Sequence, residues 1–304
     1  MSDFSGTLQL FNVIKKEYNL ENKAEKEQWT KVITAKHRLL DLHLKDVWTY
    51  RDLIRQFIKR DFITQYKQTI LGPLWYLVQP VMSSIVYIFI FGRLAGIGTD
   101  GVPQILFYFG GTMLWTFFTG CLTGCSNVFL ANQGIFSKVY FPRLTVPISL
   151  AAGQIIRLLI QFSLLVCIYL FYMFTGTRFH ITWMIVLYPF IVAWIGILGT
   201  SIGLIVSSLT TKYRDLIQLL NFGIQLAMYA TPVVYPLSEA PEKFRWLYYI
   251  NPMSAPMELS RITLYGAGSV PVDMLFISLG FTAVLAFFGL VLFTKNERNF
   301  VDVI

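Results

Sequence analysis

Two apolar stretches each carry four polar side chains at the spacing i, i+3, i+7 and i+11. The first set is Tyr76, Gln79, Ser83 and Tyr87, and the second is Gln218, Asn221, Gln225 and Tyr229. At about 100° per residue, each set stays on one face of an α-helix. Amides can hydrogen-bond hydroxyl groups and aromatic rings can stack on sugar rings, so the two faces could line a translocation channel for a sugar polymer. Hydrogen bonding between neighbouring helices, without a channel, explains the pattern equally well, because polar groups in hydrocarbon need partners.

A third polar face comprises Gln154, Arg157 and Gln161. Arg157 is the only charge near the middle of an apolar stretch, and an intramembrane arginine is a functional candidate by default. Snorkelling of its long side chain to the membrane surface, or a structural hydrogen bond, is an equally good explanation.

The chain lacks the residue patterns of energy conversion and catalysis. It contains no Gly-Lys dipeptide and therefore no phosphate-binding P-loop. No Asp or Glu lies in the middle of an apolar stretch, where proton-coupled transporters carry carboxylates and an intramembrane glycosyl- or acyltransferase would need an acid or a histidine. The three cysteines form no CxxC pair, and no HExxH sequence occurs. We expect no enzyme activity, no metal site and no cofactor in this chain, so uphill transport would need energy from another subunit.

Composition places the chain in a membrane. Of its 304 residues, 55% are hydrophobic and only 14% are charged, with a mean hydropathy of +0.57, whereas a soluble domain carries about 25% charged residues. The stretches long enough to cross a bilayer are 72–93, 104–127, 147–175, 181–209, 216–235 and 271–294. The expected fold is an all-α polytopic membrane protein with six transmembrane helices. This fold excludes a secreted enzyme, a Rossmann-type dehydrogenase and a free nucleic-acid-binding domain, and we expect no nucleic-acid partner.

Lys and Arg are divided unevenly between the two sides of such a protein. With the N-terminus in the cytoplasm, 19 of the 25 Lys and Arg residues lie on the cytoplasmic side and five, among them Arg261, on the other. The positive-inside rule then predicts that both termini are cytoplasmic. We expect residues 1–45 to form a polar cytoplasmic tail, because they contain no apolar signal-peptide core, and residues 46–304 to form the membrane domain.

Basic residues precede the first apolar stretch. Residues Val47–Phe62 alternate apolar and basic side chains at helical spacing, which predicts an amphipathic helix on the inner membrane surface. The cationic side chains here that could attract a phosphate group are Arg51, Arg55, Lys59, Arg60 and Lys67. Anchoring to anionic lipid is the alternative role for these charges, and a solvated helix packed on a partner would show the same pattern.

Two connections differ from ordinary loops. Residues 127–144 contain a short helix-like stretch, Phe129–Lys138, between the second and third apolar stretches. Residues 236–261 are rich in aromatic side chains but are interrupted by four prolines. They are too broken to span, and we expect short helices at the outer membrane face.

Several strings, in order, resemble one family. They are RDFITQYKQTILGPLW at 60–75, QP at 79–80, SKVYFPR at 137–143, KYRD at 212–215, ATPVVYP at 230–236 and NPM at 251–253. Together they resemble the membrane permeases of bacterial ABC exporters for O-antigen, capsule and teichoic acid polymers, a group of type-2 ABC transporter permeases. Each string alone is weak evidence for the family, but the strings occur in the expected order and are spread over nearly all of the chain after the tail. Residues 1–40 match nothing in the family.

The resemblance implies a multi-pass protein of the bacterial cytoplasmic membrane that works as a homodimer with two copies of a separate ATPase. ATP and Mg would be bound by that partner subunit, and the substrate would be a polysaccharide or polyol-phosphate chain linked to undecaprenyl pyrophosphate. The N-terminal amphipathic helix would border the place where this lipid-linked glycan is loaded. The same six-span plan also serves type-2 ABC permeases that export a small drug or a lipid, which is the alternative function.

The family also assigns roles to the two connections. The helix between the second and third spans contacts the ATPase, and this coupling role carries over to Asn127, Asn132, Phe136 and Lys138. The segment between the fifth and sixth spans forms outer gate helices, a role that carries over to Phe244, Trp246, Tyr248 and Tyr249.

Overall fold

The structure is a computed structural model that describes residues 44–299, with gaps at 68, 137, 140, 176–182 and 214. The predicted tail, residues 1–45, falls almost wholly outside the described residues. Residues Leu42–Ile304 group as one compact unit. The described part of this unit is helical and contains no strand, in agreement with the all-α prediction.

In the part of the chain that the structure describes, five helical segments are long and apolar enough to cross a membrane. They are Gly72–Leu94 (η1, α4 and η2), Gln104–Ser126 (α5), Thr145–Phe174 (α8), Trp183–Thr210 (η3 and α9) and Val272–Asn296 of α13, which itself runs Val272–Asn299. At about 1.5 Å per residue, the shortest of them, at 23 residues, exceeds the ~30 Å hydrocarbon core. Both ends of each segment lie within a few residues of those of a predicted span. Because several such helices are present, the chain is a multi-pass membrane protein.

The fifth predicted span, 216–235, is shorter than expected. Helix α10 covers Leu216–Tyr229, and the chain turns at Ala230–Pro236 instead of continuing. Its 14 residues reach only about 21 Å, which is less than the hydrocarbon thickness. Pro232, which lacks an amide hydrogen and resists helix continuation, follows three residues after the last helical residue.

Helix α5 is the centre of the bundle. It packs against α9, α8 and α4, and most of its side chains are buried. Helix α13 covers the other side of α9, and α3 lies along α8. By contrast, no residue of α10 is buried. Helix α10 is therefore an apolar helix that is only lightly packed against its own chain.

Glycine permits a close contact between α5 and α9. A Cβ atom added at Gly203 of α9 would lie 2.6 Å from the Leu122 carbonyl oxygen of α5, and one at Gly199 would lie 2.7 Å from that of Phe118. These two glycines form a GxxxG pair, which lets two helix backbones approach closely.

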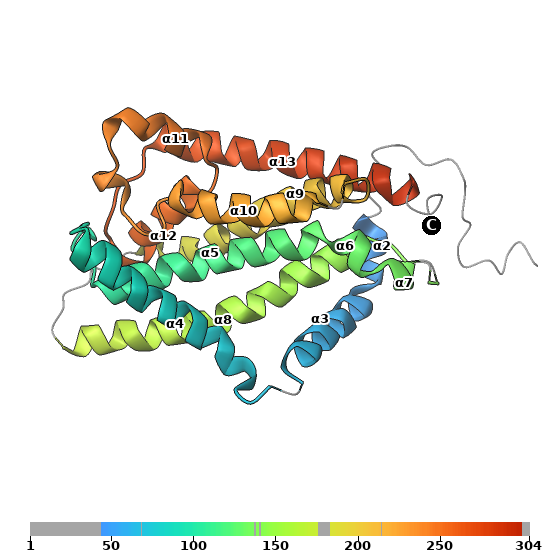
Figure 1. Cartoon of the computed structure of the whole chain (residues 1–304), viewed down its shortest axis with the longest axis horizontal. Helices are drawn as coiled ribbons and strands as arrows, with labels where there is room; N and C mark the ends of the chain where they lie inside the picture. The colour runs from blue at the N-terminus through green and yellow to red at the C-terminus, as the bar shows by residue number, and fades with distance from the viewer. Residues whose placement is uncertain are drawn as a thin grey trace, which may run out of the picture. The chain divides into compact units, whose positions relative to one another are not determined.

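Short helices gather at the two ends of the bundle (Figure 1). The end that we call the basic end holds α2 (Leu44–Thr49), α6 (Val128–Ala131), α7 (Gln133–Phe136) and the C-terminal part of α13. The opposite end, which we call the far end, holds η4 (Leu237–Glu239), η5 (Glu242–Phe244), α11 (Arg245–Ile250) and α12 (Ser254–Tyr265). The short helices expected within 236–261 are thus present.

The predicted amphipathic helix is two helices. Helix α2 ends at Thr49 and α3 spans Arg51–Tyr66, with the break at Tyr50. Val47 of α2 and Phe57 of α3 are buried in one cluster with Phe129, Phe141 and Phe293. This apolar cluster fixes both helices to the basic end of the bundle.

Candidate functional site

The first polar set lies on α4 and reaches α10 at one point. Gln79 is exposed, and Tyr76, Ser83 and Tyr87 are partly buried. The Tyr87 hydroxyl donates to the Met228 Sδ atom of α10 over 3.5 Å. The two helices that carry the predicted channel residues therefore touch within one protomer.

The second polar set lies wholly on the surface of α10. The exposed residues are Gln218, Asn221, Gln225 and Tyr229. Among the contacts of the described residues, none of the three amide side chains has a hydrogen-bond partner within this chain. An amide facing lipid would carry a free-energy cost, so this face is suited to water or to a second protein surface. Among the described residues, hydrogen bonds to other helices of the same chain do not account for these three amides.

Arg157 lies in a polar contact among three helices. Its guanidinium donates to the Gln65 Oε1 atom of α3 and stacks 4.6 Å from the centre of the Tyr76 ring. The Tyr76 hydroxyl donates to the same Gln65 oxygen over 2.9 Å, and Gln161 Nε2 donates to the Tyr76 carbonyl over 3.0 Å. Tyr76 thus faces α3 and α8, so it belongs to this cluster and lies apart from the contact between Tyr87 and α10.

Basic side chains of α3 are open to solvent or headgroups. The exposed ones are Arg51, Arg55, Lys59 and Arg60, and Lys67 follows the helix. Arg55 lies 3.5 Å from Asp52 and Arg60 lies 2.7 Å from Asp61. These pairs are largely exposed and contribute little stability, which leaves the cations available to an anionic group.

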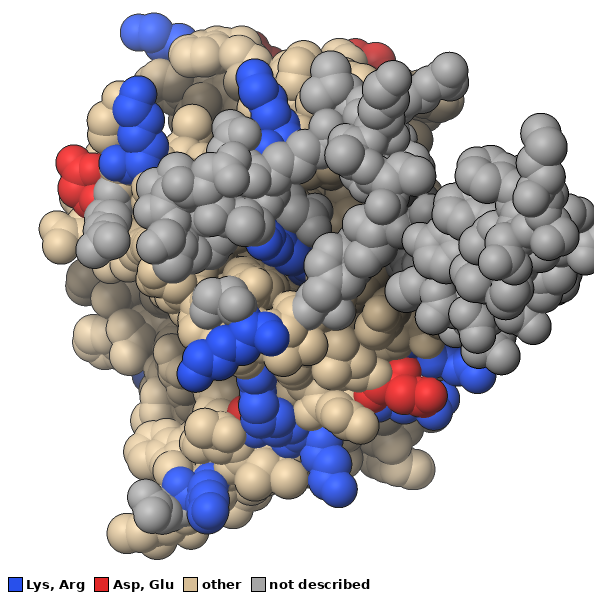
Figure 2. Space-filling view, turned by 90° about the vertical axis from the view of Figure 1, so that its right-hand side faces the viewer, with Lys and Arg blue, Asp and Glu red and all other residues tan. Residues whose placement is uncertain are grey.

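The basic end as a whole is cationic. Figure 2 views this end directly and shows many Lys and Arg side chains with few Asp and Glu among the residues that are coloured. Exposed lysines continue the pattern beyond α3, at Lys138, Lys212 and Lys295.

The connection between α5 and α8 divides into inward and outward residues. Phe136 packs with Phe129 and Phe141, and Asn132 Nδ2 donates to the Val128 carbonyl over 3.0 Å. Both side chains are buried within their own chain, so neither offers its side chain to a partner. Asn127, at the start of the connection, and Lys138, shortly after α7, are exposed. The coupling residues predicted from the resemblance therefore have different structural positions.

The predicted gate residues also separate. Phe244 and Trp246 are exposed and Tyr249 is partly buried. Tyr248 is 6% exposed and packs edge-on against Tyr235, with ring centres 6.1 Å apart. Tyr248 is thus a packing residue of the far end in this structure.

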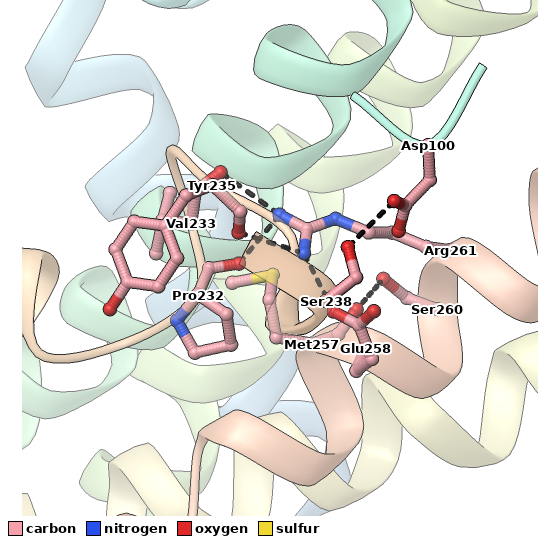
Figure 3. Close-up of polar contacts among 9 residues, drawn as sticks. All are labelled: Asp100, Pro232, Val233, Tyr235, Ser238, Met257, Glu258, Ser260 and Arg261. Atoms are coloured by element: carbon pink, nitrogen blue, oxygen red, sulfur yellow. Dashed lines mark hydrogen bonds and ion pairs between the residues drawn. The ribbon is translucent and has the colours of Figure 1, made fainter. Parts of the chain in front are cut away.

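Arg261, which the charge count assigns to the outer side, is buried within the far end. Arg261 is 4% exposed and its Nη1 atom lies 2.7 Å from Oε2 of Glu258, which is fully buried (Figure 3). Burial raises the pKa of the Glu258 carboxyl, while the adjacent Arg261 opposes that shift. The signal that sequence reasoning missed is the i, i+3 spacing of opposite charges within an apolar helix.

Comparison with known proteins identifies the family. The family described as ABC-2 type transporter matches residues 52–265, which is more than half of the chain. The chain belongs to this ABC-2 family. It is accordingly a transport subunit without a catalytic domain of its own, and the family implies a separate ATPase partner.

Named relatives of this ABC-2 permease are polymer exporters. It is 28% identical to the O-antigen export system permease protein RfbA of Klebsiella pneumoniae over 253 residues, covering 83% of this chain and 95% of that protein. It is 22% identical to RfbA of Myxococcus xanthus, covering 85% and 98%. It is 24% identical to the polysialic acid transport protein KpsM of Escherichia coli, covering 79% and 91%. The resemblance seen in the sequence is therefore confirmed.

In this ABC-2 permease, Phe136→Ala is expected to lower the free energy of unfolding by about 3–4 kcal/mol, because the change leaves a cavity in an aromatic cluster. Thermal unfolding of the detergent-purified protein measures the effect. Gln133→Ala, at an exposed position of the same helix, is the matched control. Equal unfolding temperatures for both variants would contradict the placement of Phe136.

Proposed function

We propose that this permease moves an undecaprenyl-pyrophosphate-linked polysaccharide, such as O-antigen, capsule or teichoic acid, across the bacterial cytoplasmic membrane. Two copies of the chain would form a homodimer and bind two copies of an ABC ATPase. The observation that carries the proposal is the exposed amide face of α10, which has no partner among the described residues of its own chain. The named relatives, which export O-antigen or transport polysialic acid, support a polymeric substrate.

In this proposal the basic end faces the cytoplasm, in agreement with the positive-inside rule. The exposed cations of α3, from Arg51 to Lys67, attract the pyrophosphate of the lipid-linked glycan. Charge-assisted hydrogen bonds to phosphate oxygens favour arginine at such a site.

The polymer then passes between the α4 and α10 faces of the two protomers. Gln79, Gln218, Asn221 and Gln225 bond sugar hydroxyl groups in turn, and Tyr87 and Tyr229 offer ring faces for stacking. A two-fold arrangement doubles the polar surface, because each protomer supplies the same face.

ATP binding by the partner subunit supplies the movement. The ATPase contacts the exposed residues of the 127–144 connection, among them Asn127 and Lys138. Phe136, buried beneath this surface, transmits the displacement to the helices as a rigid-body motion. Phe244 and Trp246, exposed at the far end, border the outer exit.

Deletion of the gene in a strain without a paralogue tests this function. We expect lipid-linked glycan to accumulate inside the cell and surface glycan to be lost, with both restored by the plasmid-borne gene. A matched plasmid that encodes the Lys59→Ala, Arg60→Ala permease is expected to restore export only in part. Normal surface glycan in the deletion strain would exclude polymer export, and a simultaneous gain in drug or lipid retention would favour the small-substrate alternative.

A further inference from the structure

Helix α10 ends in a turn that is largely buried. Residues Thr231–Val234 are buried, although they form no regular helix. Irregular backbone in a membrane protein is stable only where other protein groups satisfy its hydrogen bonds. The Val233 amide donates to the Thr231 carbonyl over 2.7 Å, and the side-chain donors come from Asn251 and Arg261 of the far end.

Asn251 and Arg261 donate hydrogen bonds to different residues of the turn. Asn251 Nδ2 donates to the Ala230 carbonyl over 3.1 Å and to Thr231 Oγ1 over 2.8 Å. Arg261 Nη2 donates to the carbonyls of Pro232 and Val233 over 2.5 and 3.1 Å. Arg261 Nη1 donates to the Tyr235 carbonyl over 3.2 Å (Figure 3).

Besides the turn carbonyls, the Arg261 guanidinium contacts Glu258 and Phe107. Glu258 accepts from Nη1 over 2.7 Å, and the guanidinium carbon lies 4.1 Å from the centre of the Phe107 ring of α5. A buried ion pair adds little net stability compared with apolar residues of the same size. The pair is better explained by the geometry it imposes on the turn than by its contribution to folding.

The connection 95–103 is hydrogen-bonded to the segment that follows the same turn. Ser238 Oγ, just after the turn, donates to Asp100 Oδ1 over 2.7 Å. Asp100 belongs to the 95–103 connection that follows α4 and η2. The turn after α10 is therefore bonded to Arg261 of α12, and the connection after η2 is bonded to Ser238 of η4, which directly follows that turn.

We propose that Arg261 is a positioning residue for transport, which holds the far ends of α10 and of α4–η2 at a fixed separation. Arg261 does this by binding three carbonyls of the turn after α10, while the Ser238–Asp100 contact brings in the connection after η2. The proposal rests on the pathway between α4 and α10 given under Proposed function. It adds a residue that lies outside that pathway and controls its width.

The separation can be measured without any substrate. Cysteines at Gly98→Cys and Glu239→Cys report on the two connections, because a Cβ atom at Gly98 would lie 2.8 Å from Glu239 Oε1. Cys167, which is exposed, is replaced by alanine, and the buried Cys121 and Cys125 are kept. The folded fraction of purified permease is treated with a short bis-methanethiosulfonate reagent. We expect Arg261→Met to lower the cross-linking yield about fivefold, because several charge-assisted hydrogen bonds are lost.

The functional measurement separates positioning from folding. In the complex with its ATPase, Arg261→Met is expected to reduce glycan export about tenfold per folded permease, while ATP hydrolysis stays within about twofold of wild type. Loss of a merely structural residue would lower export, hydrolysis and folded protein together. Arg245→Met, an exposed arginine 3.7 Å from Glu242 on the adjacent helix, is the matched control and should change neither export nor cross-linking.

Removal of one buried charge can prevent folding, so the double variant Glu258→Met, Arg261→Met accompanies the single one. The same fall in cross-linking in either variant supports the proposal. Unchanged cross-linking, or failure of both variants to fold, would overturn it in favour of a structural role. If the wild-type permease exported no glycan but Arg261→Met still reduced cross-linking, the positioning role would stand. Only the polysaccharide substrate would then be refuted.

Discussion

Gly203→Val is expected to lower the amount of folded permease in the membrane severalfold. A side chain at this position would meet the Leu122 carbonyl oxygen and Cys125 Cβ, each 2.6 Å from the added Cβ. Neither atom is the flexible end of a side chain, so helices α5 and α9 would have to separate. Overpacking of this kind costs about 1–3 kcal/mol and sometimes more.

The measurement is the amount of monodisperse permease recovered by size-exclusion chromatography after detergent extraction. Gly280→Val on α13 is the matched control, because an added Cβ there meets no atom within 4 Å. We expect this control to be recovered at the wild-type level. Wild-type recovery of the Gly203 variant would mean that α5 and α9 do not pack as described.

The spans could be predicted from sequence because they depend on local composition. Apolar runs of sufficient length, interrupted by charge or proline, define α5, α8, α9 and α13 to within a few residues. The broken character of residues 236–261 was predictable for the same reason. In these segments, the hydropathy and helix propensity of the residues themselves determine where a helix begins and ends.

The end of α10 could not be predicted, because it depends on distant residues. Apolar character continues through Val233 and Val234, so hydropathy extends the helix to residue 235. The chain instead turns at Ala230, where Asn251 and Arg261, 20 to 30 residues later in sequence, satisfy the freed carbonyls. Charge counting likewise assigns Arg261 to one side of the membrane but does not reveal its ion pair, since counting ignores a partner at i−3.

The candidate site divides in the same way. Helical spacing predicts that Gln218, Asn221, Gln225 and Tyr229 share one face of a helix, and all four are exposed on α10. The first set was less uniform than the spacing suggested, because Tyr76 is held by Arg157 and Gln65 from other helices. Periodicity determines which side of a helix a residue occupies, but packing decides what that side faces.

The triple variant Gln218→Leu, Asn221→Leu, Gln225→Leu is expected to reduce export of the polymer at least about 100-fold while leaving the amount of folded permease near wild type. Each amide lost removes about 1 kcal/mol of hydrogen bonding to the moving chain, and the new leucines present an apolar wall to a hydrated polymer. Folding should persist because none of the three side chains is buried or bonded within the described chain. Surface glycan and membrane abundance, measured in the complemented deletion strain, give the two quantities.

Helix α10 provides its own control. Leu219, Phe222 and Leu226 are also exposed but occupy the adjacent apolar face, so alanine at all three should leave export within about threefold, as for substitutions away from a binding surface. If the apolar face alone proved sensitive, α10 would present its apolar side to the substrate, as a lipid exporter requires. Increased lipid export by the leucine variant would favour the same conclusion, because removal of the amides would then lower the barrier for an apolar molecule in transit.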